Sequence, residues 1–197
     1  MRIGILALQG AVAPHRAKLA ALGHEGAPVR DAEDLAPCRG LIIPGGESTT
    51  MLKLIQDFGL RGALLEFAAR RPVWGVCAGA ILIAEQVENP PQDSLALLPI
   101  AVRRNAYGRQ NESFITEVTV TLPGAPPVRQ EAVFIRAPVV TRHGPEVSVL
   151  ASHGGHPVAL RHGRHLAATF HPELSLPDTL HRYFATLCSE AAERMSA

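Results

Sequence analysis

The sequence predicts an α/β fold, with an open, mostly parallel sheet, helices on both of its faces and a small antiparallel appendage near one edge. Three aliphatic runs, at residues 3–8, 41–43 and 73–76, are continuous rather than alternating, which is typical of parallel strands covered on both faces. Each run is followed by a glycine-containing turn and then by a helical pattern. This repeated order of strand, turn and helix indicates a parallel sheet.

The predicted helices of the first half follow these strands. The first covers about residues 11–22 and ends at Gly23. The second begins after a turn at residues 44–46, with Ser48 as its predicted N-cap. Its apolar side chains share one face: Met51, Leu52, Ile55 and Phe58. The third covers residues 80–84, soon after the third strand.

The second half has a different pattern, from which we predict the antiparallel appendage. Residues 115–122 carry β-branched side chains in rough alternation, and residues 132–135 form another short strand. Residues 158–169 are predicted to form a hairpin that turns at His162-Gly163. A closing helix follows, and its apolar stripe consists of Leu180, Phe184, Leu187 and Ala191.

Composition limits the class of protein. The 197 residues contain no linker or repeat, so we expect a single domain over residues 1–197. The 19 basic and 18 acidic residues give a net charge of +1, which provides no general attraction to nucleic acid or to a membrane surface. No signal peptide or membrane-spanning run is recognisable. The three cysteines, Cys38, Cys77 and Cys188, form no disulfide framework, and a reducing cytoplasm is expected.

The strongest local signal for chemistry is the sequence GVCAG at residues 75–79, between a predicted strand and a predicted helix. A nucleophile on such a sharp turn has a strained backbone, and the flanking glycines let the chain fold back without Cβ clashes. The turn presents the Cys77 thiol at the carboxyl end of a strand, where open α/β sheets bind ligands. Helix N-terminal N–H groups favour the thiolate. Cys38 and Cys188 lack this setting, and we expect both to be buried structural thiols.

A nucleophilic cysteine needs a base, and His171 is the best candidate. It follows the apolar strand of residues 166–170, and Glu173 stands two residues further on. That carboxylate can accept a hydrogen bond from one ring nitrogen while the other nitrogen faces the thiol. Four other histidines lie close together in the sequence, but no acidic or thiol ligand stands among them at zinc-like spacing. We expect these to be solvated loop histidines rather than a metal site: His153, His156, His162 and His165.

A third element is PGGES at residues 44–48, again between a buried strand and a helix. Glycines there let the backbone approach a ligand, and N–H groups at the start of a helix stabilise negative charge. By itself this pattern is equally typical of a plain connection in which Ser48 caps the helix.

Together these motifs resemble the triad-type class I glutamine amidotransferases, whose sheet is flavodoxin-like. More narrowly, the chain resembles the glutaminase subunits of pyridoxal 5′-phosphate synthase over essentially its whole length. The matching strings, in order, are ALQG (7–10), PGGESTT (44–50), CAG (77–79), RN (104–105), GRQ (108–110), SF (113–114), FIRAP (134–138) and FHPEL (170–174). One position departs from the family pattern, because Ile115 replaces the acidic residue usual after SF.

The resemblance implies an activity and its residues. Cys77, His171 and Glu173 would form a triad that hydrolyses L-glutamine to glutamate and ammonia. Backbone N–H groups of Gly46 and Ala78 would form the oxyanion hole. The residues implied to hold the amino-acid end of the substrate are Gly46, Glu47, Ser48, Arg104, Ile135 and Arg136. This set suits a zwitterion, because a carboxylate can bind the substrate ammonium group and a guanidinium can bind its carboxylate.

The resemblance also implies a partner and no cofactor or metal. Ammonia would pass to a (β/α)8-barrel synthase subunit that builds pyridoxal 5′-phosphate, within a large ring-shaped complex of both subunits. Gln9 and Gly10, in the loop after the first strand, are candidates for coupling the two activities. Two alternatives remain open from the residues: a cysteine hydrolase or redox-sensing protein of the same topology, and a catalytically silent binding subunit.

Overall fold

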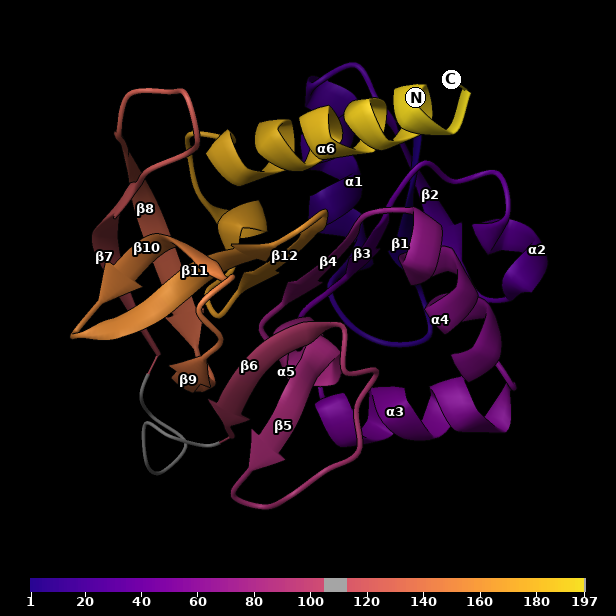
Figure 1. The fold of residues 1–197 in the computed structure, drawn as a ribbon, viewed down its shortest axis with the longest axis horizontal. Coiled ribbons are helices and arrows are strands. Elements are labelled where there is room, and N and C mark those ends of the chain that lie inside the picture. Colours follow the sequence, from indigo (N-terminus) through magenta and orange to yellow (C-terminus); the bar gives the residue numbers. More distant parts are fainter. Residues whose placement is uncertain (105–112, 197) are drawn as a thin grey trace.

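The computed structural model describes residues 1–104 and 113–196, and its main sheet has seven strands in the order β10-β11-β12-β4-β3-β1-β2 (Figure 1). The strands are β1 (Arg2–Leu6), β2 (Glu25–Val29), β3 (Leu41–Ile43), β4 (Val73–Val76), β10 (Ser148–His153), β11 (His156–His162) and β12 (His165–Ala168). The segment β2-β1-β3-β4-β12 is parallel throughout. This order is the flavodoxin-like one, and it confirms the predicted fold class.

Helices cover both faces of the sheet, as predicted. One face packs against α1 (Val12–Ala21) and α6 (Thr179–Ser196). The other packs against α2 (Ala32–Leu35), α3 (Ser48–Asp57), α4 (Arg61–Arg70) and α5 (Ala78–Ile83). Successive side chains of β1 enter the two cores in turn, Ile5 toward α1 and α6 and Leu6 toward the other layer. Burial on both faces explains why this strand has no polar alternation.

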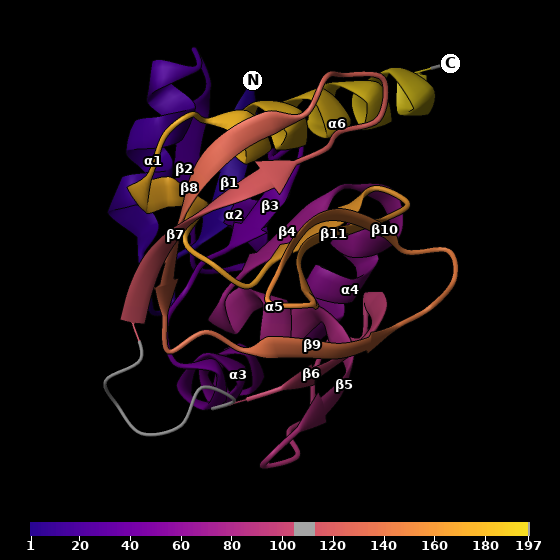
Figure 2. The ribbon, with the colours of Figure 1, turned by 90° about the vertical axis from the view of Figure 1, so that its left-hand side faces the viewer.

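Two smaller sheets lie beside the main one (Figure 2). One combines β5 (Ala84–Glu88), β6 (Leu98–Arg103) and β9 (Val139–His143). The other is the antiparallel hairpin of β7 (Ser113–Val120) and β8 (Val128–Ile135). Together with the antiparallel strands β10 and β11 at the sheet edge, these form the predicted appendage. A short 3-10 helix, η1 (Pro172–Leu174), joins β12 to α6.

Several predicted elements are confirmed with small changes in their bounds. The strand at residues 73–76, the first helix and the hairpin of β11 and β12 lie where predicted. The third helix is earlier and longer than expected, since α5 begins directly after Cys77. The first strand ends at Leu6 rather than at residue 8. Within the described residues, no helix combines the length and apolarity that crossing a membrane requires.

Two details of the second predicted helix are wrong. Glu47, not Ser48, caps α3, because the Glu47 carboxylate accepts hydrogen bonds from the N–H groups of Thr49 and Thr50. Phe58 is 63% exposed, since α3 ends at Asp57 and the residue beyond it leaves the apolar face. The edge strand β2 was not predicted, because its sequence EGAPV contains Gly and Pro and buries only two side chains.

Candidate active site

Cys77 lies on the sharp turn between β4 and α5. Its backbone has φ 50° and ψ −105°, a conformation that L-residues rarely adopt. The turn is possible only with glycines on both sides, since a Cβ at Gly75 would collide with the Gly79 carbonyl and a Cβ at Gly79 with the Ile43 carbonyl. The Cys77 N–H donates to the Ala168 carbonyl at 2.8 Å, which ties the turn to β12. The strained turn predicted from GVCAG is therefore present.

His171 and Glu173 reach the same place from the end of β12. The His171 backbone N–H donates to the Val133 carbonyl of β8 at 2.8 Å. Its ring Nδ1 lies 2.7 Å from Glu173 Oε1, and both side chains are buried. Cys77 and His171 line the same cavity, and the thiol raises the pKa of the imidazole. The structure thus brings the three predicted residues together in the order thiol, imidazole, carboxylate.

The electrostatics of this group favour a charged imidazole. Burial alone lowers the pKa of His171, but its hydrogen bonds to Cys77 and Glu173, with their charges, outweigh burial and raise the pKa to about 10. Burial raises the pKa of Glu173, yet the hydrogen bond from His171, with smaller electrostatic contributions from His15 and His171, brings it below the ordinary value. An imidazolium beside a thiol is the counter-ion that a thiolate requires.

A cavity of about 450 Å³ opens in front of Cys77, a size typical of a site for a small ligand. Its lining includes most of the predicted residues: Gly10, Gly46, Glu47, Ser48, Cys77, Ala78, Arg104, Ile135, Arg136 and His171. Gln9 and Glu173 do not line it; each lies just behind a residue that does. Pro138, from the matching string at residues 134–138, also forms the wall, as do Ala11 and Ile81, which belong to none of the motifs.

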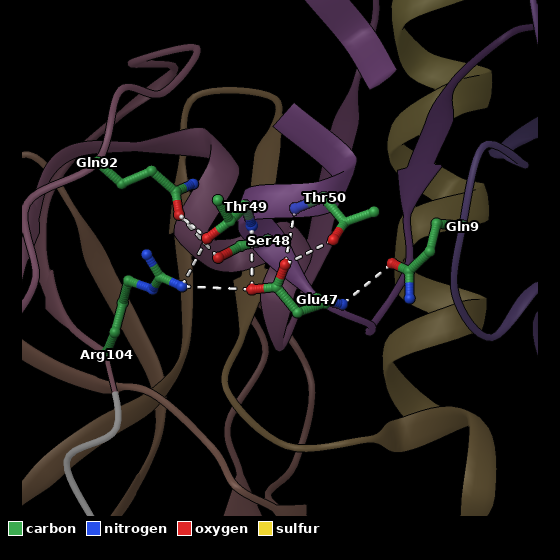
Figure 3. Close-up of polar contacts among 7 residues, drawn as sticks. All are labelled: Gln9, Glu47, Ser48, Thr49, Thr50, Gln92 and Arg104. Atoms are coloured by element: carbon green, nitrogen blue, oxygen red, sulfur yellow. Dashed lines mark hydrogen bonds and ion pairs between the residues drawn. The ribbon is translucent and has the colours of Figure 1, made fainter. Parts of the chain in front are cut away.

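The carboxylate of Glu47 is the centre of a polar network at one side of the cavity (Figure 3). Its Oε1 accepts from Thr49 N at 3.2 Å and from Arg104 Nη2 at 3.3 Å, and its Oε2 accepts from Thr50 N at 2.7 Å. Burial raises the pKa of this carboxyl, but the backbone and hydroxyl hydrogen bonds of Thr50 and Thr49 outweigh it and lower the pKa. Glu47 and Arg104, expected to take opposite ends of a zwitterion, here pair with each other.

Gln92 is a member of this network that the sequence did not reveal. Its Oε1 accepts from Ser48 Oγ at 3.0 Å and from Thr49 Oγ1 at 3.3 Å (Figure 3). It lies in the connection between β5 and β6, and no motif marks it, because only the folded chain brings that connection to the start of α3.

The loop after β1 is anchored on the turn that precedes α3. Gln9 Oε1 accepts from the Glu47 N–H at 3.0 Å, and the Ala11 N–H donates to the Gly45 carbonyl at 3.1 Å. Gly10 has φ +105°, and a Cβ there would meet the same carbonyl. A trans peptide directs its N–H away from its carbonyl, so this contact fixes the direction of the Gly46 N–H.

Comparison with known proteins shows the family of this chain. The model of the SNO glutamine amidotransferase family matches residues 5–190. The chain belongs to this family. A relative from Koribacter versatilis, named pyridoxal 5'-phosphate synthase subunit PdxT, is 50% identical, with 93% of this chain and 94% of that protein covered. The protein of the same name from Niallia circulans is 47% identical, with 97% and 100% covered. A crystal structure of a glutamine amidotransferase has a TM-score of 0.87 at 43% identity, covering 95% of this chain and 98% of that one.

In this glutamine amidotransferase, some residues singled out in the sequence lie away from the cavity, and others lie outside the residues that the structure describes. Asn105 and the GRQ string at 108–110 lie outside the described residues. Ile115, which replaces the usual acidic residue, is 65% exposed on β7 and does not line the cavity. Cys38 and Cys188 are both buried, and burial raises the pKa of each thiol.

The four clustered histidines are not loop residues, contrary to expectation. They occupy strand ends: His153 in β10, His156 and His162 in β11 and His165 in β12. His165 is half-buried and its Nδ1 accepts from the Val73 N–H at 3.2 Å, so it joins β12 to β4. Across residues 1–104 and 113–196, no three His, Cys, Asp or Glu side chains gather in a way that suits a metal ion.

Replacing Gly45 by alanine should cripple turnover without unfolding the protein. The added methyl group would collide with the His171 ring. A displacement of about 1 Å in a reacting group costs on the order of 100-fold in rate, so we expect kcat to fall by about that factor. Ammonia release from glutamine measures this. Gly62→Ala is the matched control, since a Cβ at Gly62 of α4 meets nothing within 4 Å. Equal kcat for the two variants would contradict the expectation.

Proposed function

We propose that this chain hydrolyses L-glutamine to glutamate and ammonia through Cys77, His171 and Glu173, and delivers the ammonia to the synthase subunit of pyridoxal 5′-phosphate synthase. The observation that carries the proposal is the buried His171–Glu173 pair, 2.7 Å apart, beside a thiol on a strained turn in a glutamine amidotransferase. Its relatives' names supply the second half, since they are called subunits of that synthase.

The proposed reaction proceeds in two stages. The Cys77 thiolate attacks the side-chain amide carbon of glutamine, and the carbon–nitrogen bond breaks after His171 gives its proton to the departing ammonia. A thioester joins Cys77 to the glutamyl group. Water then attacks the thioester carbon while His171 takes a proton from it, and the carbon–sulfur bond breaks. Glutamic acid leaves and gives its proton to solvent as glutamate, and the Cys77 thiolate beside a protonated His171 is restored. Glu173 holds the His171 ring in the tautomer and orientation that both stages need.

The oxyanion of each tetrahedral intermediate would be met by the backbone N–H groups of Gly46 and Ala78. Ala78 is the first residue of α5, where backbone N–H groups lack partners within the helix. Each such donor contributes about 2.7–4 kcal/mol to transition-state stabilisation.

The amino-acid end of glutamine would lie against Gly46, Glu47, Ser48, Arg104, Ile135 and Arg136, all of which line the cavity. A substrate carboxylate is a better partner for Arg104 than the contact at 3.3 Å that it makes with Glu47, whose oxygens already receive N–H and O–H donors. We therefore expect Arg104 to exchange Glu47 for the substrate carboxylate on binding.

The partner would be a (β/α)8-barrel subunit in a large ring-shaped complex, working in the cytoplasm, with residues 1–197 as one amidotransferase domain. Gln9 and Gly10 would couple the subunits. Their loop contacts both the Gly45 carbonyl and the Glu47 N–H, so a partner that moves the loop also moves the Gly46 N–H.

The proposed function is tested by ammonia release from glutamine, with the chain alone and with the synthase subunit. We expect release that the partner increases. If the complex released no ammonia, the chain would be either a cysteine hydrolase acting on another substrate or a silent binding subunit.

Replacing Arg104 by glutamine should raise KM more than it lowers kcat. The guanidinium would bind the unreacting end of the substrate, and a lost hydrogen bond to a charged group costs about 1.5–3 kcal/mol. We thus expect KM to rise by about 10- to 100-fold in a steady-state glutaminase assay. Arg103→Gln is the control, because Arg103 is exposed and pairs with Glu88 at 3.9 Å outside the cavity. A KM unchanged in Arg104→Gln would remove Arg104 from the substrate site.

A further inference from the structure

Two fully buried histidines lie behind Glu173, on the side away from the cavity. His15 comes from α1 and His181 from α6, and neither side chain is exposed at all. His15 Nδ1 lies 3.0 Å from His181 Nε2, and His15 Nε2 lies 3.7 Å from Glu173 Oε2. Trp74 of β4 packs edge-on against both rings. The two helices and the sheet thus hold an imidazole against the carboxylate that contacts His171.

The polar atoms between His15 and Glu173 have no other partner. His15 Nε2 and Glu173 Oε2 are both buried without a hydrogen bond to any described residue. A buried polar atom without a partner is costly, and these two are each other's nearest complement. The separation exceeds a hydrogen bond by a few tenths of an ångström, and such contacts in unliganded sites often shorten when substrate binds.

We propose that His15 is a positioning residue that acts through Glu173, with His181 setting its tautomer. His181 donates its Nε2–H to His15 Nδ1, which leaves the His15 proton on Nε2, directed at Glu173 Oε2. Glu173 Oε1 then remains free for His171. This inference rests on the proposed triad, which it extends by two residues.

Both histidines are neutral donors rather than cations. Burial lowers the pKa of His15 to about 4, with Glu173 opposing and His171 adding to the effect, and burial places the pKa of His181 well below its ordinary value. A neutral His15 holds the carboxylate without competing with His171 for its negative charge. Two titratable groups lie on the cavity side of Glu173: His171 and Cys77. Those on its other side are His15, Lys18 and His181.

The test compares two polar replacements of similar size. His15→Gln keeps an amide N–H near the place of the ring Nε2, whereas His15→Asn keeps one only near Nδ1, which faces His181. We expect His15→Asn to lower kcat about tenfold, the effect of losing one hydrogen bond to a charged group, with KM nearly unchanged. The acid limb of its pH profile should move up by about one pH unit, because Glu173 loses a donor that favours its charged form. His15→Gln should keep the kcat and the acid limb of the wild-type protein.

A double replacement separates positioning from general packing. In a Glu173→Ala background, His15→Asn should lower kcat no further, since it acts only through the missing carboxylate. His165→Gln, at the other end of β12, is the control for replacing a partly buried histidine. Equal kcat and pH profiles for wild type, His15→Asn and His15→Gln would overturn the inference, and so would an additional loss in the Glu173→Ala background.

Should His15→Asn fail to fold, the comparison can be made at His181, which contacts His15 on the side away from Glu173. We then expect His181→Gln to keep the wild-type kcat and His181→Leu to lower kcat by less than about tenfold. Failure of the triad itself is recognised separately. If Cys77→Ala or His171→Asn kept wild-type turnover, the proposed function would fall. If both lost turnover while the His15 and His181 variants matched wild type, only this inference would fall.

Discussion

Cys77→Ala should release no measurable ammonia from glutamine, alone or with the synthase subunit. The thiol is the nucleophile in the proposed reaction, and the cavity offers no second thiol to replace it, since Cys38 and Cys188 are buried elsewhere. Removing the nucleophile of a triad costs at least about four orders of magnitude in kcat. The glutaminase assay measures this, and a thermal melt confirms that the variant is folded.

Cys38→Ala is the matched control for that variant. Cys38 is a buried free thiol whose Sγ donates to the Asp34 carbonyl at 3.3 Å, far from the cavity lining. It should lose some stability but keep its turnover per folded molecule. If Cys38→Ala lost ammonia release and Cys77→Ala retained it, the nucleophile would have been assigned to the wrong residue.

His171→Asn should lose turnover almost as completely. The imidazole gives a proton to the departing ammonia and later takes one from water, and asparagine can do neither. Members of a triad act as a unit, so we expect a loss within about tenfold of that in Cys77→Ala and no further loss in the double variant. Single and double variants in the glutaminase assay test this. Additive losses would indicate that the two residues act independently.

The wild-type pH profile provides a second check on His171. Contacts with Cys77 and Glu173 raise the pKa of its imidazole to about 10, so the ring holds its proton at neutral pH and loses it only in alkaline solution. We expect kcat to fall as the pH rises through about 10, because the general acid is then missing. A fall centred near pH 6.5, the ordinary value for histidine, would mean that the contacts with Cys77 and Glu173 do not govern its protonation.

The parts of the site that could be predicted are those encoded within a few residues. GVCAG specifies its own strained turn through the two glycines, and His171 stands two residues from the carboxylate that orients it. The parallel arrangement of the central strands also follows from local patterns, since buried runs, turns and helices alternate along the first half. The edge strand β2 could not be predicted, because it buries only two side chains and its sequence has no regular alternation of apolar residues.

What could not be predicted depends on contacts between distant segments. Gln92 meets Ser48 across 44 residues, and His15 meets His181 across 166. Residue preference predicts Ser48 as the N-cap of α3, but in the folded chain Ser48 Oγ donates to Gln92 and the Glu47 carboxylate caps the helix. Such pairings arise only once the helices pack on the sheet, and no spacing in a single sequence specifies them.

The most direct measurement is the mass of the chain after incubation with a glutamine analogue that carries a diazoketone in place of its amide. Such an electrophile reports on a nucleophile that can attack the substrate's reacting carbon. We predict one adduct per chain, located on the peptide that contains Cys77, blocked by excess glutamine and absent from Cys77→Ala. Equal labelling of wild type and Cys77→Ala, or an adduct on Cys38 or Cys188, would contradict the assignment of Cys77 as the residue that attacks glutamine.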